Sequence, residues 1–310
     1  MTGPPSDVLV ERALRMDALI TTLRDPIDRA VLEAGRGSLR VIAQDAAGLD
    51  NVDLIAAAEF GIAVTNTPDV LTAATAEFAL FMMGALSRKL MASEALVREG
   101  RWGAWHPWFP VLGDEVTGKC IAIVGCGRIG RALAGACLGL DMDLLLVART
   151  LPDGWLDSVR EIQAIRARMG GRQASVEMST LDEALPRADY VSLHVPLVTH
   201  GSRATKHLID ERRLRRMKAS AHIVNTSRGA VIDEEALIRA LRERWIAGAA
   251  LDVFVTEPLP LSSPLLAPDL ADRVRVFHHF GSGTRETRLG LDPARSMAGR
   301  CVANLLAALA

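Results

Sequence analysis

The chain has 310 residues, of which 49% are hydrophobic and 24% are charged, and its formal net charge is −1. This is an ordinary globular composition, and the length allows two domains of roughly 100–200 residues each. No basic stripe or tail is present, and the densest basic run, ERRLRRMK at 211–218, is interpreted as the solvated face of a helix. The sequence therefore argues against a nucleic-acid partner.

Neither a targeting signal nor a membrane segment is expected. The N-terminus lacks the pattern of basic residues followed by an apolar stretch. The most apolar run, 78–86, is shorter than the roughly 20 residues that a spanning helix needs, and it is interpreted as a buried helix. No C-x-x-C pair or zinc-type spacing involves the four cysteines, Cys120, Cys126, Cys137 and Cys301. A reduced, cytoplasmic protein without a bound metal is the simplest interpretation.

Short apolar segments alternate with helical patterns along the chain. Strands are expected at 18–21, 40–44, 62–66, 120–125, 143–148, 190–195, 221–226, 248–254 and 273–278. Helices are expected at 72–99, 128–140, 155–169, 210–218, 233–243 and 284–308. Many of the strands are apolar throughout, as is typical of parallel strands that are covered on both faces. The alternation predicts an α/β fold with a doubly wound parallel sheet.

The chain is expected to form two domains. Residues 1–84 together with 284–310 form the first domain, and residues 85–283 form an inserted dinucleotide-binding domain. The Gly and Pro content of 101–119, which holds Trp102, Trp105 and Trp108, favours a loop there.

The stretch IAIVGCGRIG carries a glycine fingerprint between an expected strand and an expected helix. Gly125, Gly127 and Gly130 have the G-x-G-x-x-G spacing, which suits a tight turn, close approach to a pyrophosphate, and helix–strand packing. Arg128 and Ile129 open the helix, whose free N–H groups attract phosphate. A glycine turn that serves packing alone is the alternative.

The end of the next strand indicates which dinucleotide binds. An acidic residue would hold the ribose 2′-OH of NAD, but Ala148, Arg149 and Thr150 stand there. A guanidinium can hold a 2′-phosphate through two charge-assisted hydrogen bonds. NADP(H) is therefore predicted as the preferred cofactor, with NAD(H) as the alternative. Arg149 could instead stack on the adenine or remain solvated.

Three ionisable residues follow apolar strands further along the chain. Arg228, Glu257 and His279 are expected to converge, because the carboxyl ends of parallel strands border the ligand crevice. Arginine can hold a carboxylate and polarise a carbonyl, histidine can transfer a proton, and a carboxylate can orient the imidazole. The alternatives are a structural ion pair for Arg228 and an ordinary surface carboxylate for Glu257.

Several motifs together resemble the D-isomer-specific 2-hydroxyacid dehydrogenase family, from about residue 15 to the end. The motifs are GLDNVDL (48–54), GIAVTNTPDVLTAATAEFAL (61–80), VGCGRIGRALA (124–134), LHVPL (193–197), IVNTSRGAVIDEEAL (223–237), AALDVF (249–254) and HFGSGTRET (279–287). The loop 101–113 is similar to that of glyoxylate and hydroxypyruvate reductases. The resemblance implies a Rossmann-type domain inserted into a smaller, flavodoxin-like substrate domain. It also implies NADPH-dependent reduction of a small 2-oxo acid by a homodimer.

The resemblance assigns roles to individual residues. Arg228 would bind the substrate carboxylate and keto oxygen, His279 would be the general acid, and Glu257 would be its hydrogen-bond partner. Further cofactor contacts are implied for Thr75, Val195, Pro196, Thr226 and Asp252. Asp252 could instead cap the loop after its strand. His194 is expected to support a cofactor loop rather than to transfer protons.

The substrate site is expected to include backbone amides and one tryptophan. The loop 46–49, which includes Ala47 and Gly48, would hold the substrate carboxylate, although relatives have more glycine there. Trp105 would reach the active site of the partner subunit. The alternative is that Trp102, Trp105 and Trp108 only pack at an interface.

The chain also departs from the family pattern. Roughly the first 40 residues of the pattern have no counterpart, so either the first domain is smaller or the start of the chain is incomplete. His278 stands where relatives carry a proline that would stiffen the backbone before His279. These departures leave an alternative function open, a dehydrogenase-fold protein with little or no activity that binds NADP(H) and a protein partner.

Overall fold

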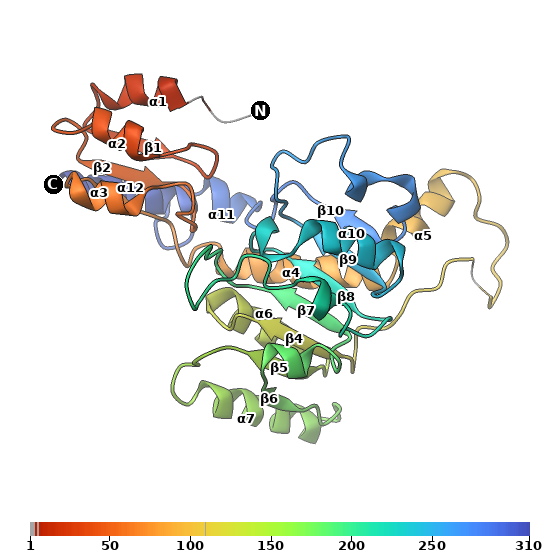
Figure 1. Ribbon diagram of the computed structural model, residues 1–310. Helices are drawn as coiled ribbons and strands as arrows, with labels where there is room; N and C mark the ends of the chain where they lie inside the picture. The colour runs from red at the N-terminus through yellow and green to blue at the C-terminus, as the bar shows by residue number, and fades with distance from the viewer. Residues whose placement is uncertain (1–3, 5, 109) are drawn as a thin grey trace. The chain divides into compact units, whose positions relative to one another are not determined.

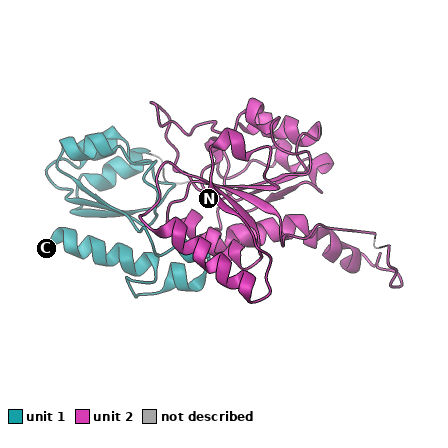
Figure 2. Ribbon diagram, turned by 90° about the horizontal axis from the view of Figure 1, so that it is seen from below, with its two compact units in different colours: residues 1–74, 282–310 teal, residues 75–281 magenta. Residues whose placement is uncertain are grey.

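The computed structural model describes residue 4, residues 6–108 and residues 110–310. Figure 2 shows two compact units, Met1–Ala74 with Ser282–Ala310 (unit 1) and Thr75–Gly281 (unit 2). The first boundary lies near the start of helix α4 (Thr72–Ser87) rather than at residue 84, because Ala76, Ala79, Met82 and Met83 of this helix are buried in a core of unit 2. The second boundary lies at Gly281 rather than at residue 283.

Unit 1 is built on a three-stranded parallel sheet in the order β1-β2-β3. Its strands are β1 (Ala18–Thr21), β2 (Val41–Gln44) and β3 (Ala63–Thr65), and its helices are α1 (Ser6–Ala13), α2 (Arg29–Ala34), α3 (Leu54–Glu59), α11 (Arg285–Leu289) and α12 (Met297–Leu309). Asp28 and Asp53 cap α2 and α3 by accepting backbone N–H bonds. Helix α12 contacts β2 and β3, and Asn304 donates a 2.8 Å hydrogen bond to the carbonyl of Asn66.

Unit 2 is built on a seven-stranded parallel sheet in the order β10-β9-β8-β7-β4-β5-β6 (Figure 1). Its strands are β4 (Cys120–Val124), β5 (Asp143–Val147), β6 (Val176–Met178), β7 (Tyr190–Leu193), β8 (His222–Asn225), β9 (Gly248–Leu251) and β10 (Val274–Val276). The chain order reverses between the neighbours β4 and β7, so the crevice at their carboxyl ends is the expected ligand site of a doubly wound sheet. The parallel sheets and the alternation of strands with helices confirm the predicted α/β class.

Helices and short 3₁₀ turns precede and connect these strands. They are α4, α5 (Leu90–Arg98), α6 (Arg128–Leu138), α7 (Trp155–Arg168), α8 (Leu181–Ala184), α9 (Glu211–Leu214), α10 (Glu234–Arg242), η1 (Gly229–Val231), η2 (Pro264–Leu266) and η3 (Pro268–Leu270). No helix in the described part of the chain is long and apolar enough to cross a membrane.

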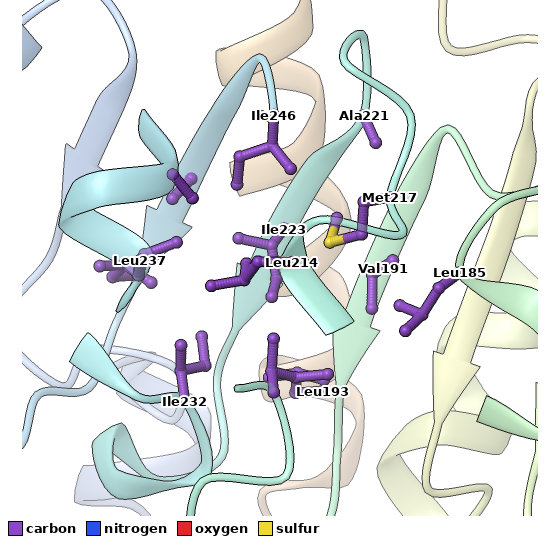
Figure 3. Close-up of a cluster of buried hydrophobic side chains, with 14 of the residues drawn as sticks. Leu185, Val191, Leu193, Leu214, Met217, Ala221, Ile223, Ile232, Leu237 and Ile246 are labelled. Atoms are coloured by element: carbon purple, nitrogen blue, oxygen red, sulfur yellow. The ribbon is translucent and has the colours of Figure 1, made fainter. Parts of the chain in front are cut away.

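Two buried layers explain why the strands of unit 2 are apolar throughout. Successive side chains of β4 alternate between them, with Ala122 and Val124 in one cluster and Ile121 and Ile123 in the other. Figure 3 shows the first cluster, in which Val191, Leu193 and Ile223 of two strands meet helix residues such as Leu214 and Leu237. Burial of each such side chain contributes about 1.5–3 kcal/mol, so both layers stabilise the sheet.

Some sequence-based boundaries differ from the structure. The segment 72–99 is two helices rather than one, because Lys89 adopts a left-handed backbone with φ 50° between α4 and α5. The segment 284–308 is also two helices, α11 and α12, and the stretch that separates them contains Pro293. Strand β6 was not predicted, because its three residues, Val-Glu-Met, are too few to show a pattern.

Candidate active site

The turn between β4 and α6 is the first part of the candidate site. Gly125 has φ +96°, and a Cβ there would lie 2.6 Å from the carbonyl oxygen of His194. A Cβ on Gly130 would lie 2.1 Å from the carbonyl oxygen of Gly125. Packing therefore explains both residues, but a Cβ on Gly127 would meet no atom within 4 Å. Space above Gly127 is what a bound pyrophosphate needs, which favours the dinucleotide interpretation.

The N-terminus of α6 has the character of a phosphate site. Gly127 is the N-cap and offers no side-chain hydrogen bond to the first amides of the helix, which begins with Arg128 and Ile129. The amides of a first helical turn and the helix dipole favour a negative charge at this position. These residues fit the diphosphate of a dinucleotide.

The end of β5, next to β4 in the sheet, carries Arg149 and Thr150. Both are exposed, and Ala148 before them is partly buried. The strand end thus offers a guanidinium and a hydroxyl, and no carboxylate.

His194 links the ends of β7 and β8 beside the glycine turn. Its ring nitrogen Nε2 lies 2.8 Å from Ser192 Oγ, and Nδ1 lies 3.5 Å from Thr226 Oγ1. Burial lowers the pKa of His194 to about 4, so the ring is neutral at pH 7. Val195 and Pro196 follow it, and the neutral ring suits a supporting role for this loop rather than proton transfer.

His279 and Glu257 form a hydrogen-bonded pair in unit 2. His279 Nδ1 lies 2.9 Å from Glu257 Oε2, and the two side chains are 28% and 31% exposed. Glu257 Oε1 accepts a 3.0 Å hydrogen bond from the amide of Phe254. When Nδ1–H donates its hydrogen bond to Glu257, Nε2 is the ring nitrogen that can exchange a proton with a ligand.

The electrostatics of Glu257 favour its charged form. Burial by itself raises the pKa of Glu257, but the hydrogen bond and charge of His279, the Phe254 amide and the charge of Arg228 together bring it below its ordinary value. Glu257 is therefore ionised at neutral pH and accepts the hydrogen bond that orients the His279 ring.

Arg228 follows β8 in a turn that the neighbouring polar residues shape. Asn225 Oδ1 accepts hydrogen bonds from the amide and hydroxyl of Ser227, and Asn225 Nδ2 donates to the Arg228 carbonyl. A Cβ on Gly229 would lie 2.0 Å from the carbonyl carbon of Phe254, so the turn packs directly on the loop after β9. This packing brings Arg228 to the same sheet edge as Glu257.

Asp252, at the end of β9, holds the turn that carries His279. Its carboxylate is 1% exposed and accepts hydrogen bonds of 2.6 and 2.8 Å from the amides of Phe280 and Gly281, while its carbonyl accepts one of 2.9 Å from His279. Burial raises the pKa of Asp252, and these amides oppose that effect. A Cβ on Gly281 would lie 3.1 Å from Asp252 Oδ2 and 3.3 Å from Thr75 Cγ2, so Thr75 also lies at this turn.

Aromatic rings pack around the same turn. The Phe78 ring of α4 makes edge contacts with Phe277 and Phe280, with centroids 5.1 and 5.6 Å apart. His278 stacks at a tilt on Phe280 with centroids 5.2 Å apart. His279 itself has φ 58°, a conformation that costs a side-chain-bearing residue energy. The hydrogen bonds to Asp252 and these rings hold it there.

The other predicted substrate residues, Ala47 and Gly48, belong to unit 1 and follow β2. Asn66 Nδ2 donates a 2.8 Å hydrogen bond to the Ala47 carbonyl, and Gln44 Nε2 donates one of 3.4 Å to the Gly48 carbonyl. The polar network thus fixes the carbonyls of this loop.

The loop after α5 exposes its tryptophans. Trp102, Trp105 and Trp108 are 67%, 72% and 79% exposed. None of the three is buried within unit 2, and exposed aromatic side chains are enriched where proteins bind partners.

Comparison with known proteins identifies the family. Residues 80–281 match the family model of the D-isomer specific 2-hydroxyacid dehydrogenase NAD binding domain. The chain is 44% identical over 288 residues to a glyoxylate reductase of Korarchaeum cryptofilum, which covers 92% of this chain and 80% of that protein. It is 40% identical over 299 residues to a glyoxylate reductase of Thermococcus litoralis, covering 93% and 81%. The chain belongs to the D-isomer-specific 2-hydroxyacid dehydrogenase family.

Solved structures agree with this assignment. The TT0316 protein of Thermus thermophilus has a TM-score of 0.83 at 38% identity, and the match covers 100% of this chain and 88% of that one. A glyoxylate reductase from Paecilomyes thermophila has a TM-score of 0.77 at 29% identity, with coverages of 97% and 84%. The protein is therefore an NAD(P)-dependent 2-hydroxyacid dehydrogenase that uses a nicotinamide cofactor.

Sequence reasoning missed several residues that position the dehydrogenase site. Asn225, Gln44 and Asn66 make the hydrogen bonds that shape the two turns described above. A signal was present for Asn225, because a short amide side chain directly after an apolar strand commonly bonds to its own turn. Gln44, a polar residue that is 0% exposed in an apolar strand, gave a similar signal. No group of His, Cys, Asp and Glu residues in the described part of the chain could hold a metal ion.

Two glycines of helix α6 in this dehydrogenase, Gly130 and Gly135, provide a test variant and its matched control. Gly130→Ala should destabilise unit 2 and weaken cofactor binding, because the new Cβ would lie 2.1 Å from the Gly125 carbonyl oxygen. Overpacking of this kind typically costs about 1–3 kcal/mol. Gly135→Ala in the same helix meets open space and should be neutral or stabilise by up to about 1 kcal/mol. Urea unfolding of both variants tests this, and equal stabilities would contradict it.

The free energy of unfolding of the dehydrogenase should depend on pH, because burial keeps His194 neutral in the folded chain. The unfolded chain binds a proton at His194 near the ordinary value of 6.5, while the folded chain does so only near pH 4. Stability should therefore fall as the pH drops through this window, by roughly 2–3 kcal/mol from this group. His194→Gln should flatten the plot of unfolding free energy against pH between 6.5 and 4. Parallel plots for the variant and the wild type would contradict it.

Proposed function

We propose that this dehydrogenase reduces a small 2-oxo acid of the glyoxylate or hydroxypyruvate type with NADPH. The observation that carries the proposal is the 2.9 Å hydrogen bond between His279 and Glu257, at the sheet edge where Arg228 also lies. The named activity of relatives at 40–44% identity, glyoxylate reduction, supports the substrate class.

The chemistry follows from the roles that these side chains can take. A bound reduced nicotinamide supplies a hydride. Arg228 binds the substrate carboxylate and stabilises the negative charge that develops on the keto oxygen, which is commonly the largest catalytic contribution. His279 donates the proton from Nε2 to that oxygen, and ionised Glu257 keeps the imidazole oriented through its hydrogen bond to Nδ1. In the reverse direction His279 accepts the proton.

The residues of the glycine turn would hold the cofactor. The amides after Gly127 suit the diphosphate, and Thr75, Val195, Pro196 and Thr226 are proposed to surround the nicotinamide half. Asp252 is proposed to lie beside the nicotinamide, where it also holds the turn at Phe280 and Gly281. On the substrate side, the amides of Ala47 and Gly48 are proposed to bind the carboxylate.

A homodimer is part of the proposal. The exposed Trp102, Trp105 and Trp108 are the surface that would contact the second subunit, with Trp105 reaching its substrate. Aromatic residues are enriched at such interfaces.

An assay of NADPH oxidation with glyoxylate, hydroxypyruvate and pyruvate tests the proposal. Turnover of glyoxylate or hydroxypyruvate supports it. Cofactor binding without turnover of any of the three acids would favour the binding-protein alternative.

Replacement of the proton donor should separate chemistry from binding. His279→Gln should lower kcat by about 100-fold or more, because general acid catalysis contributes 10²–10⁴-fold. The Kd for NADPH should change by less than about threefold, since the substitution leaves the glycine turn intact. His200→Gln is the control, because His200 is exposed and is not among the residues assigned to the site. Near-normal kcat in His279→Gln would refute the assignment.

Arg149 should determine the cofactor preference. The wild type should have a higher kcat/KM with NADPH than with NADH, and Arg149→Gln should lower the NADPH value by about 10–100-fold, as loss of a charge-assisted hydrogen bond predicts. The NADH value should change little, because NADH has no 2′-phosphate. Arg168→Gln, at the exposed end of α7, is the matched control. An NADH preference in the wild type would overturn the proposal.

A further inference from the structure

Unit 2 contains a cavity of about 750 Å³ at the sheet edge where the strands begin. His222, the first residue of β8, lines it, as do Arg273 and Arg275 at the start of β10 and Ala247 just before β9. The proposed catalytic residues follow the opposite ends of these same strands. Because the sheet is parallel, the cavity is separate from the candidate active site.

Four basic side chains line this cavity: Lys89, Arg244, Arg273 and Arg275. They come from three places in the chain, namely the α4–α5 junction, the end of α10 and strand β10 with its preceding residue. Two carboxylates, Asp114 and Asp272, also line it, so the basic groups outnumber the acidic ones by four to two. Burial lowers the pKa of His222, which makes this lining residue a neutral donor.

Within the described part of the chain, these four cations lack the carboxylate partners that several other arginines of the protein have. Arg166, Arg213 and Arg242 have carboxylate partners within 4 Å. Among the ion pairs of the described residues, none involves Lys89, Arg244, Arg273 or Arg275. Grouped cations that lack an anion repel one another, and the lining carboxylates do not relieve this by direct pairing.

The hydrogen bonds of the arginines leave donors available. Arg273 Nη1 donates to the Leu241 carbonyl at 2.9 Å, and Arg275 Nη1 donates to the carbonyls of Val274 and Ala271. Arg275 Nε is buried and has no hydrogen-bond partner within the described residues. A buried donor without a partner costs about 1–3 kcal/mol unless a ligand or water satisfies it.

Two of the four cations also have unusual backbones. Lys89 and Arg244 have φ values of 50° and 63°, in the left-handed region. Such conformations cost residues with side chains energy and cluster at ligand clamps. Both residues line the cavity, and each has its strained backbone next to a helix end, Lys89 before α5 and Arg244 after α10.

We propose that this cavity binds a small phosphate-bearing anion at a site distinct from the cofactor site. Guanidinium groups suit phosphate oxygens because they offer paired donors in one plane. Leu86, Val111 and Leu112 form an apolar wall that can contact the organic part of a phosphate ester. The ligand class is thus a diphosphate or a small organic phosphate, held mainly by Arg244, Arg273 and Arg275.

Thermal unfolding of the whole chain in the presence of inorganic diphosphate tests the proposal. Saturating NADPH is present throughout, because diphosphate alone could occupy the glycine turn, and sodium chloride keeps the ionic strength equal. At about ten times its Kd, diphosphate should raise Tm by about 2 °C, as ligand linkage predicts. Glycerol phosphate in a parallel series shows whether an organic group adds affinity over diphosphate.

The double variant Arg244→Gln/Arg273→Gln should lose this shift, and Arg244→Gln, which changes an exposed side chain, should weaken the apparent Kd by about tenfold. Arg168→Gln carries the same charge change on α7 and should keep the full shift. Two results would overturn the proposal: no shift in the wild type, or an equal shift in the double variant. Neither of these depends on which 2-oxo acid is turned over.

Discussion

The buried carboxylate of Asp252 accepts the amides of Phe280 and Gly281, and its backbone carbonyl accepts the amide of His279. Three consecutive residues after β10 are thereby tied to the residue that directly follows β9. His279 is left in a strained left-handed conformation that these bonds can stabilise. The geometry of the His279–Glu257 pair depends on this clamp, because the imidazole can meet the carboxylate only when its backbone is held.

Two carboxylates near one histidine have opposite electrostatics. Burial dominates at Asp252 and raises its pKa, whereas at Glu257 the bonds and charges of His279, Phe254 and Arg228 overcome burial and lower the pKa. Glu257 can therefore act on the proton of His279, while Asp252 serves the backbone. Pairs of titratable groups whose surroundings separate their pKa values are typical of sites that transfer protons.

The two edges of the parallel sheet in unit 2 have different roles. At the carboxyl ends, the glycine turn, His194, Arg228 and His279 provide helix amides and ionisable groups, which we propose bind a nucleotide and an acid. At the amino ends, cations without carboxylate partners surround a cavity. In both places, residues far apart in the chain meet because parallel strands bring corresponding ends to one edge.

The sequence by itself determined the local features of this protein. Apolar runs located every strand except β6, and the glycine spacing located the nucleotide turn. The sequence also showed Arg149 near the strand end where an acidic residue would hold the ribose of NAD. These features depend on neighbours a few residues away, so periodicity and spacing reveal them. Only the tertiary structure decided the strand order, the break at Lys89, the clamp by Asp252 and the meeting of Arg244 with Arg273. These depend on contacts between distant segments, which one sequence does not specify.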